Sequence, residues 1–341
     1  MGVFQPASSG QGPQAESAPI VDPRLRPTPD NGTLGPSSDI AASASSASTL
    51  KATSPKPFAP IIAAAIGVVF AVLVGNIGSA HAAWSKFSTL FSVPAGSPVS
   101  AKDSPQLDRM KPQKQAEALL ELAVGEKPGA VDQISSRVSR WQGKMHWDSQ
   151  IASLTTAALN SNDMRVRESG VEVELAAYGL AKNSASLDYL LRTSESRDHA
   201  QKIWALWALG LMGNRGVESD RVVQTLIGHL SDADEDSRRW SVEGLALVGS
   251  AQTIAPLLKT MHDDSSPIVR ERAACSLAES GMFTQEQRLT AVPELLSYSD
   301  DPALDAQTHV WAFQALADIT HQRLPHDSNV WRNWYESTKN E

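Results

Sequence analysis

Apolar residues recur at helical spacing along the C-terminal part of the chain, in two patterns that alternate. The first pattern is an aliphatic residue followed three and four residues later by two more, as in Leu187, Leu190 and Leu191. The second is a basic or polar residue followed at +3 and +7 by small or apolar residues, as happens after Lys202. Apolar positions at these spacings lie on one face of an α-helix. Each pair of patterns therefore predicts two amphipathic helices.

The two patterns repeat in step five times. The first begins at Ile151, Leu187, Val223, Ile254 and Val292, at intervals of 31 to 38 residues. The second follows 15 to 17 residues later each time, at Arg167, Lys202, Arg239, Arg270 and His309, with the copy at Arg167 degenerate. One helical hairpin cannot bury its apolar face alone, so hairpins of this kind stack on one another. The sequence predicts an all-α fold, an α-solenoid of about five hairpins.

Turns and helix ends agree with this division into hairpins. Short segments rich in Asp, Ser and Asn separate the two helices of each unit, and such residues cap helix N-termini. Gly213, Gly249 and Gly281 follow the second patterns of their units and are predicted to end those helices.

Two segments carry a resemblance to a known family. Residues 255–281, APLLKTMHDDSSPIVRERAACSLAESG, and more loosely residues 292–318 resemble the short HEAT repeat first noted in phycobilisome lyases. The resemblance covers about residues 147–320, with residues 113–142 similar to an N-terminal cap. Residues 318–337 resemble the closing segment of many bacterial HEAT proteins, although His321 stands where that segment has glycine. The resemblance implies a HEAT/armadillo-like superhelix that holds other proteins, and no residue is carried over as catalytic.

The N-terminal part of the chain differs in kind from the repeats. Residues 1–57 are rich in Pro, Ser and Ala and are predicted to be a disordered tail. Residues 58–83 lie in a stretch without charged residues, and their apolar run would span roughly 35 Å as a helix, enough to cross a bilayer. This segment is predicted to be a transmembrane or signal-anchor helix. Residues 84–112 are predicted to form a juxtamembrane segment and flexible stalk, followed by the solenoid over 113–341.

The basic residues that flank the apolar segment indicate its orientation. Lys51 and Lys56 precede it closely, and Lys86 and Lys102 follow it. The positive-inside rule favours a single-pass protein whose tail is cytoplasmic and whose solenoid is extracytoplasmic, in the periplasm or on the outer face. The alternative is an export signal cleaved after Ala82, which would yield a secreted solenoid.

Composition and motifs argue against several classes of function. The formal net charge is −8, whereas phosphate contacts with nucleic acid need a basic face. The single cysteine, Cys275, excludes an internal disulfide and a zinc–cysteine site, and it fits a packing role. No Gly-x-Ser-x-Gly elbow or glycine-rich phosphate loop is present. We therefore expect no enzyme, no catalytic residue, no cofactor and no small-molecule substrate.

Two clusters contain residue types that can bind metal ions. Asp232, Asp234, Asp236 and Glu243 have calcium-loop spacing, but the same residues fit a capping turn that runs into a helix. His321 and His326 lack the spacing and the partners of a zinc site. The sequence predicts no metal ligand.

Aromatic residues gather on one face of the predicted second helices. At about 100° per residue, offsets +1, +2 and +5 from the basic position point away from the hairpin core, toward the expected concave face. The aromatic and aliphatic residues at these offsets are the candidate partner-binding residues: Ile203, Trp204, Trp207, Trp240, Val310 and Trp311. Such a face fits a groove for a peptide or helix; alternatively, these rings are core, because large aromatic residues are usually buried.

These observations predict a membrane-anchored scaffold that uses its solenoid to recruit or brace a partner protein. Because the folded part is acidic, a basic or neutral protein is expected rather than nucleic acid. The alternative is a non-catalytic or lyase-like subunit of an enzyme assembly.

Overall fold

A computed structural model describes residues 104–339. Among these residues every regular element is a helix, as the sequence predicts. No helix in this range is long and apolar enough to cross a membrane. The predicted tail, the segment 58–83 and residues 84–103 of the predicted juxtamembrane segment and stalk lie outside the described residues. Residues 104–109, which the sequence places in the flexible stalk, form a helix whose Leu107 is buried.

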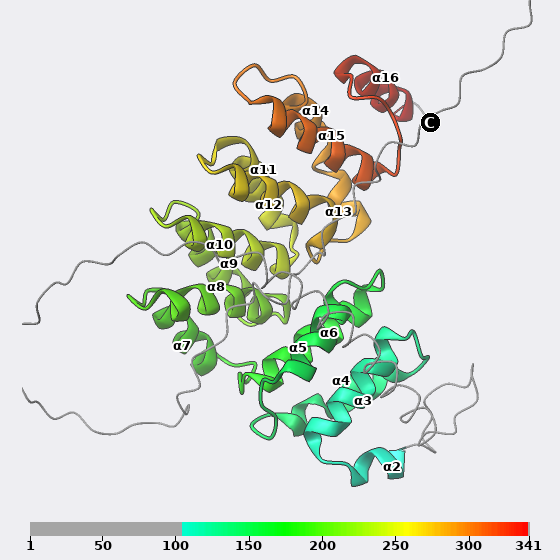
Figure 1. Ribbon diagram of the computed structural model, residues 1–341, viewed down its shortest axis with the longest axis vertical. Helices are drawn as coiled ribbons and strands as arrows, with labels where there is room; N and C mark the ends of the chain where they lie inside the picture. Colours follow the sequence, from blue (N-terminus) through cyan, green and yellow to red (C-terminus); the bar gives the residue numbers. More distant parts are fainter. Residues whose placement is uncertain (1–103, 340–341) are drawn as a thin grey trace, which may run out of the picture. The chain divides into compact units, whose positions relative to one another are not determined.

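The helices form six antiparallel pairs with additional elements at both ends and near the C-terminal pairs (Figure 1). Their bounds are α2 (Ser104–Arg109), α3 (Pro112–Val124), α4 (Ala130–Trp141), α5 (Ser149–Leu159), α6 (Met164–Ala177), α7 (Ser184–Ser194), α8 (His199–Asn214), α9 (Ser219–His229), α10 (Glu235–Val248), the 3-10 helix η1 (Ala251–Thr253), α11 (Ile254–Asp263), α12 (Pro267–Cys275), the π-helix η2 (Ser276–Ser280), α13 (Gln285–Leu289), α14 (Val292–Tyr298), α15 (Ala306–Thr320) and α16 (Ser328–Thr338).

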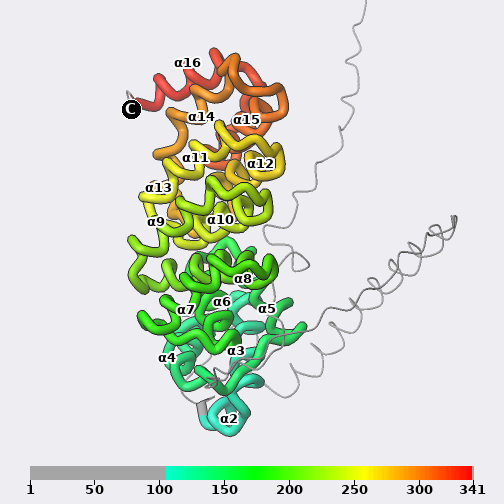
Figure 2. Tube along the Cα trace, turned by 90° about the vertical axis from the view of Figure 1, so that its left-hand side faces the viewer, coloured from blue at the N-terminus to red at the C-terminus, as the bar shows by residue number. Residues whose placement is uncertain are grey.

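The pairs follow one another in chain order, from α3/α4 to α14/α15, and α16 packs on α14 at the end (Figure 2). Each second helix packs on the second helix of the next pair, so α4, α6, α8, α10, α12 and α15 form one continuous layer. The packing is uneven, because α8 contacts α10 far more extensively than it contacts α6.

Side-chain caps fix the start of each second helix from α6 onward. The capping residues are Asp163, Asp198, Asp234, Ser266 and Asp305, and each side chain accepts a hydrogen bond from a backbone N–H in the first turn. These caps satisfy N–H groups that have no partner within the helix. The predicted role of the Asp- and Ser-rich turns is confirmed.

The three glycines expected to end second helices behave differently. Gly249 caps α10 in the left-handed conformation, with φ 64°, and Gly281 ends η2 with an ordinary negative φ. The prediction is wrong for Gly213, which lies inside α8, where Arg215 is the C-cap. A Cβ at Gly213 would lie 2.8 Å from Cγ2 of Val248. Close packing, and not helix termination, explains that glycine.

The repeat register differs by one residue in the fourth pair. The sequence pattern assigned its basic position to Arg239, whereas the structure gives that role to Arg238, four residues after the Asp234 cap. Two hydrogen bonds join Arg238 to the carboxylate of Asp264, at 2.8 and 3.1 Å. Adjacent arginines made the two registers equally compatible with the apolar pattern.

With this correction, a ladder of ion pairs joins successive pairs of helices. In each case the basic residue four positions after a cap binds an aspartate in the turn of the next pair. The ladder consists of Lys202 with Asp232 at 2.9 Å, Arg238 with Asp264 at 2.8 Å, and Arg270 with Asp305 at 2.5 Å.

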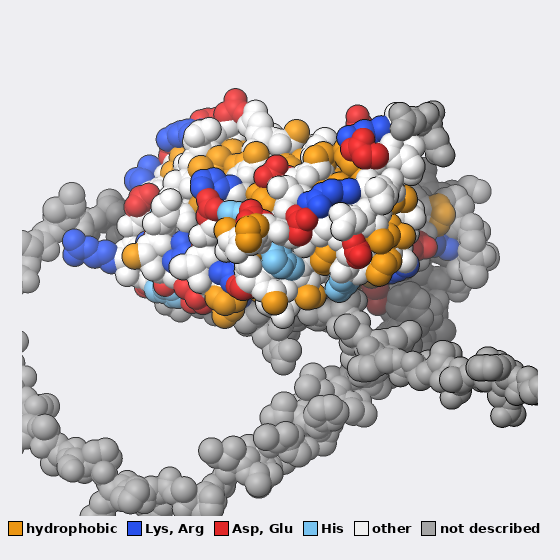
Figure 3. All heavy atoms as spheres, turned by 90° about the horizontal axis from the view of Figure 1, so that it is seen from above, with side chains coloured by type: hydrophobic (Ala, Val, Ile, Leu, Met, Phe, Trp, Pro, Cys, Tyr) orange, Lys and Arg blue, Asp and Glu red, His pale blue; other side chains and the backbone are white. Residues whose placement is uncertain are grey.

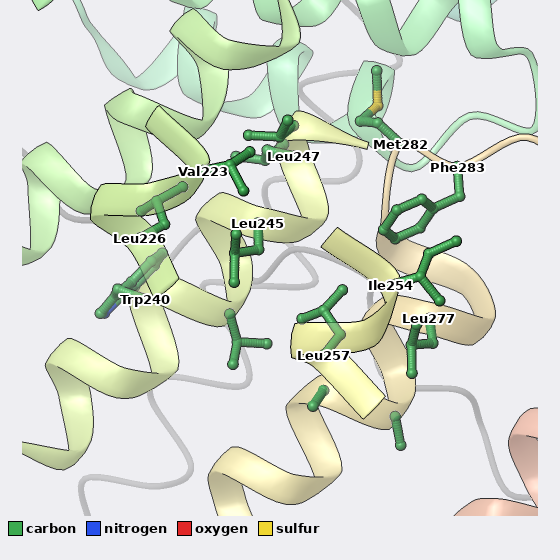
Figure 4. Close-up of a cluster of buried hydrophobic side chains, with 14 of the residues drawn as sticks. Val223, Leu226, Trp240, Leu245, Leu247, Ile254, Leu257, Leu277, Met282 and Phe283 are labelled. Atoms are coloured by element: carbon green, nitrogen blue, oxygen red, sulfur yellow. The ribbon is translucent and has the colours of Figure 1, made fainter. Parts of the chain in front are cut away.

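One continuous hydrophobic core extends from Leu159 at the end of α5 to Trp331 of α16. Side chains of neighbouring helices interlock in it, as shown for Trp240, Leu245, Ile254, Leu257 and Phe283 (Figure 4). Because each pair buries its apolar face against the next, stability comes from nearest-neighbour contacts.

Candidate functional site

The second helices present the face that the sequence analysis selected. In the corrected register, offset +2 holds Ser169, Trp204, Trp240, Arg272 and Trp311, and offset +5 holds Glu172, Trp207, Glu243, Cys275 and Gln314. The face is therefore aromatic over α8 and α10 but mixed over α12 and α15.

Three of the predicted contact residues lie in the core of the described unit. Trp204 and Trp207 are 1% exposed and Trp240 is 4% exposed. The rings of Trp207 and Trp240 meet edge to face at 5.7 Å, and Trp204 packs edge to face on Tyr178 at 5.8 Å. Of the two interpretations left open by the sequence, these exposures favour core packing for the three tryptophans.

The other three candidates are more accessible. Ile203 is half-buried on α8, and Trp311 is half-buried on α15. Val310 is 39% exposed. Within residues 104–339 the six residues do not share one exposed aromatic surface, since Trp204, Trp207 and Trp240 are buried. Trp311 lines a depression.

That depression lies between α12, η2 and α15, and we call it the α12–α15 groove. Its floor consists of Ala274, Ala278 and Ala315, whose short side chains leave the space open. Its polar and aromatic rim consists of Glu271, Arg272, Cys275, Glu279, Trp311, Gln314 and Asp318. The groove is shallow, with a volume of about 90 Å³.

Carboxylates dominate the charge of the α12–α15 groove. Arg272 forms an ion pair with Glu243 of α10, and Arg323 lies 4.0 Å from Asp318. Glu271, Glu279 and Asp318 all face the groove. Burial is the main cause that raises the pKa of Glu271, and burial together with Glu279 raises the pKa of Asp318. These raised values indicate carboxylates that a nearby cation would stabilise.

Cys275 lies on the rim of this groove, but its surroundings do not activate it. Burial raises the pKa of its thiol to about 11. A thiol with a raised pKa is a poor nucleophile at neutral pH. The packing role expected for Cys275 agrees with this environment.

A larger cavity of about 1000 Å³ adjoins the groove and shares Ala278, Glu279 and Asp318 with it. We call it the arginine cavity, because Arg167 of α6, Arg288 of α13 and Arg323 line it. Asn160, Thr284, Gln285 and His321 add further polar groups. Neither this cavity nor its arginines is predicted as a site from the sequence.

The two candidate metal clusters have structural roles. Asp234 caps α10, and Glu243 is helical and pairs with Arg272, so the acidic turn 232–236 is a capping turn. His326 stacks on Phe313 with ring centroids 4.9 Å apart. Within residues 104–339, no group of three or more His, Cys, Asp or Glu side chains could hold a metal ion.

Sequence signals existed for part of the site. Glu271, Arg272 and Cys275 occupy the concave offsets of their repeat, as Trp311 does in the next one. The carboxylates Glu279 and Asp318 lie at offset +9, two turns beyond offset +2 on the same face. The repeat pattern does not include this offset, so the sequence did not predict these residues as part of a site.

The fold and the groove define the class of this chain: an α-solenoid of stacked helical hairpins whose second helices carry the candidate site. The sequence profile named HEAT repeats matches residues 184–278 and, in an overlapping match, residues 223–317. The solenoid belongs to the HEAT-repeat family over these residues.

Comparison with solved structures gives weaker likenesses. An engineered protein is 17% identical, covering 61% of this chain and 90% of its own, with a TM-score of 0.30. A designed armadillo repeat protein in complex with the peptide (KR)4 is 16% identical, covering 61% and 99%, with a TM-score of 0.32. The structure of computationally designed armadillo repeat proteins for modular peptide recognition is 15% identical, with a TM-score of 0.30. The match covers 60% of this chain and 99% of the designed protein. TM-scores this low support no inference about the function of this chain. No curated protein matches the chain.

Proposed function

We propose that this chain is a non-catalytic scaffold that binds an extended, basic segment of a partner protein in the α12–α15 groove. The observation that carries the proposal is the groove itself, which combines a half-buried indole, an alanine floor and three carboxylates. Aromatic anchors in partly buried positions often dominate peptide affinity.

Charge selects the class of partner. Arg323 lies 4.0 Å from Asp318, and the charge of Arg272, which pairs with Glu243, acts on Glu271. Burial nevertheless raises the pKa of both Glu271 and Asp318. A lysine or arginine side chain would restore the favourable environment of these carboxylates, and its stem or guanidinium would pack on Trp311. A basic segment therefore fits better than an acidic or purely apolar one.

The end of the stack offers a weaker candidate for a binding surface. The end of the stack that carries α14 and α16, seen in Figure 3, mixes acidic, basic and hydrophobic side chains over the described residues. Charges of both signs interspersed in this way are ordinary for a solvated surface.

A site-specific crosslink tests the proposal. A photoreactive phenylalanine analogue replaces the exposed Gln314 beside the groove, and in a control it replaces the exposed Gln224 of α9. We expect the Gln314 probe to capture one partner through a lysine- or arginine-rich peptide, identified by mass spectrometry. Capture of the same peptide from position 224, or of an acidic peptide from position 314, would contradict the proposal.

Two variants measure the energetics of the same contact. Trp311→Ala should weaken binding of the captured peptide roughly tenfold or more, since it removes the anchor. The double variant Glu271→Gln, Asp318→Asn should weaken it and reduce its dependence on salt. Trp334→Ala, a half-buried tryptophan of α16 outside the groove, is the control and should leave affinity unchanged.

We further propose that residues 58–83 anchor the scaffold in a membrane with the solenoid on the extracytoplasmic side. The length and apolar character of that segment support this proposal. An anchor raises the local concentration of the groove near membrane-bound partners. N-terminal sequencing of the mature protein distinguishes the anchor from cleavage after Ala82, and protease protection of spheroplasts tests the orientation.

The second candidate function is a lyase-like subunit of an enzyme assembly. It would require a partner that carries the reactive groups, because the groove's thiol has a raised pKa. Identification of the crosslinked partner decides between these roles.

A further inference from the structure

Two nearly fully buried arginines converge on the end of η2. Arg167 is 7% exposed and Arg288 is 8% exposed. Arg167 Nη1 donates to the carbonyl oxygens of Glu279 and Gly281 at 3.1 and 3.3 Å. Arg288 Nη2 donates to the same two oxygens at 2.9 and 2.6 Å. The two guanidinium groups are therefore neighbours on one wall of the arginine cavity.

The position of Arg167 in the repeat makes this arrangement unusual. It lies four residues after the Asp163 cap, which is the ladder position that Lys202, Arg238 and Arg270 occupy in later pairs. Those three residues each pair with an aspartate of the next pair of helices. Arg167 has no such partner, because α6 packs only loosely on α8 and the side chain turns toward the C-terminal pairs.

Neither Arg167 nor Arg288 has a carboxylate within ion-pairing distance in the part of the chain that the structure describes. The helix carbonyls satisfy hydrogen bonds but carry only partial charge. Burial is the main cause that lowers the pKa of both guanidinium groups, that of Arg288 to about 10, and the charge of Arg167 lowers it further. The charge of Glu279 acts favourably on both groups. Two adjacent buried cations thus share one nearby carboxylate and form no ion pair with it, which is a costly arrangement.

The cavity offers both the space and the donors for an anion. Arg167 binds carbonyls through Nε and Nη1, and Arg288 does so through its two terminal nitrogens. Arg167 Nη2 and Arg288 Nε have no acceptor among the described residues. Arg323, whose side chain is 84% exposed, adds a third guanidinium at the edge.

We propose that the arginine cavity binds a phosphate dianion, either free or as the phosphomonoester group of a larger molecule. A phosphate group carries two negative charges near neutral pH and presents several acceptor oxygens. Planar guanidinium groups match these oxygens in paired hydrogen bonds. Glu279 and Asp318 also line the cavity, and their charges reduce the attraction of the three guanidinium groups for any anion. The proposal goes beyond the peptide-binding function, since phosphate binding needs no partner protein.

Binding of inorganic phosphate to the full chain, purified in a mild detergent, tests the proposal directly. The probe is inorganic phosphate at constant ionic strength, followed by calorimetry and by the thermal midpoint, with chloride as the reference ion. We expect saturable binding of one phosphate per chain and a rise of the midpoint that chloride does not reproduce. The absence of both effects at millimolar phosphate would overturn the proposal.

Variants separate the site from general electrostatic attraction. Arg288→Gln should abolish binding but also removes hydrogen bonds to η2, so it can lower stability. Arg323→Gln keeps the fold, because its side chain is exposed, and should weaken phosphate binding roughly tenfold, as expected for a hydrogen bond to a charged group. Arg165→Gln is the matched control on α6, being 63% exposed and paired with Asp132 outside the cavity. Equal affinities of the Arg323 and Arg165 variants would also overturn the proposal.

The source of the phosphate follows from a third comparison. A phosphoserine peptide and glycerol 3-phosphate are titrated beside inorganic phosphate. If one of them binds at least tenfold tighter, and Arg323→Gln weakens it, the site is confirmed and that ligand class is assigned. If inorganic phosphate binds tightest, the site is confirmed as one for the free ion.

Discussion

Gly210 of α8 and Gly244 of α10 lie in direct backbone contact. A Cβ added to Gly210 would be 2.6 Å from the carbonyl oxygen of Gly244, and a Cβ on Gly244 would be 2.8 Å from the carbonyl oxygen of Leu206. Only hydrogen fits at either position. This close approach brings Trp207 and Trp240 together at 5.7 Å and covers the aromatic part of the second-helix face.

Gly210→Ala should therefore destabilise the solenoid by about 1–3 kcal/mol, because the methyl group must push two backbones apart. Urea unfolding followed by circular dichroism at 222 nm measures the change. Gly228→Ala in α9 is the matched control, since a Cβ there meets nothing within 4 Å. It should raise stability by about 0.5–1 kcal/mol through helix propensity alone. The same sign of effect for both variants would contradict the contact.

The ion-pair ladder makes a second prediction. The side chains of Arg238 and Asp264 are 12% and 4% exposed and share two hydrogen bonds. Arg238→Gln leaves the buried carboxylate without its cation and should cost about 3 kcal/mol of unfolding free energy.

The control for the ladder is the exposed pair Arg165 and Asp132, whose side chains are 63% and 71% exposed. Arg165→Gln should change the unfolding free energy by no more than about 1 kcal/mol. A loss at Arg238 as small as at Arg165 would show that the ladder contributes little.

His262 predicts a dependence of stability on pH. A hydrogen bond to Asp263, opposed by burial, and a second one to Asp301 in the next pair raise the pKa of His262 above 6.5. A raised pKa in the folded state stabilises the protein most at pH values below the unfolded pKa, and this contribution disappears as pH rises through the folded pKa.

His262→Gln should accordingly lower the urea midpoint more at pH 6 than at pH 8.5. His146→Gln, with a side chain 72% exposed, controls for the general effect of removing a histidine. A difference between wild type and the His262 variant that stays constant over this pH range would rule out the proposed linkage.

The helices and their order could be predicted from the sequence, because apolar spacing and capping residues are local signals. The solvent exposure of the second-helix face could not be predicted in this way. Trp204 and Trp311 occupy the same offset, yet Trp204 is core and Trp311 lines a groove. The difference depends on how closely neighbouring helices approach, which glycine pairs such as Gly210 and Gly244 decide in three dimensions.

The arginine cavity was still less predictable. Arg167 reaches the carbonyl of Gly281 across 114 positions of the chain. That contact depends on the path of the whole stack, and no periodic pattern records it. Only the failure of Arg167 to fit the repeat marked it as different, since the pattern there was degenerate.

The last turn of the solenoid offers a stabilising substitution. His321 caps α15 with φ 58° and ψ 22°, in the left-handed region, at the position where related closing segments have glycine. The left-handed conformation is unfavourable for a residue with a Cβ but not for glycine. His321→Gly should raise the unfolding free energy by about 0.5–1 kcal/mol, the gain being limited by the greater freedom of glycine in the unfolded chain. Thr320→Gly, one residue earlier and still helical, should instead lower it by about 1 kcal/mol. Opposite signs at these adjacent positions would show that backbone conformation, and not loss of a side chain, determines the effect, whereas destabilisation by both would contradict it.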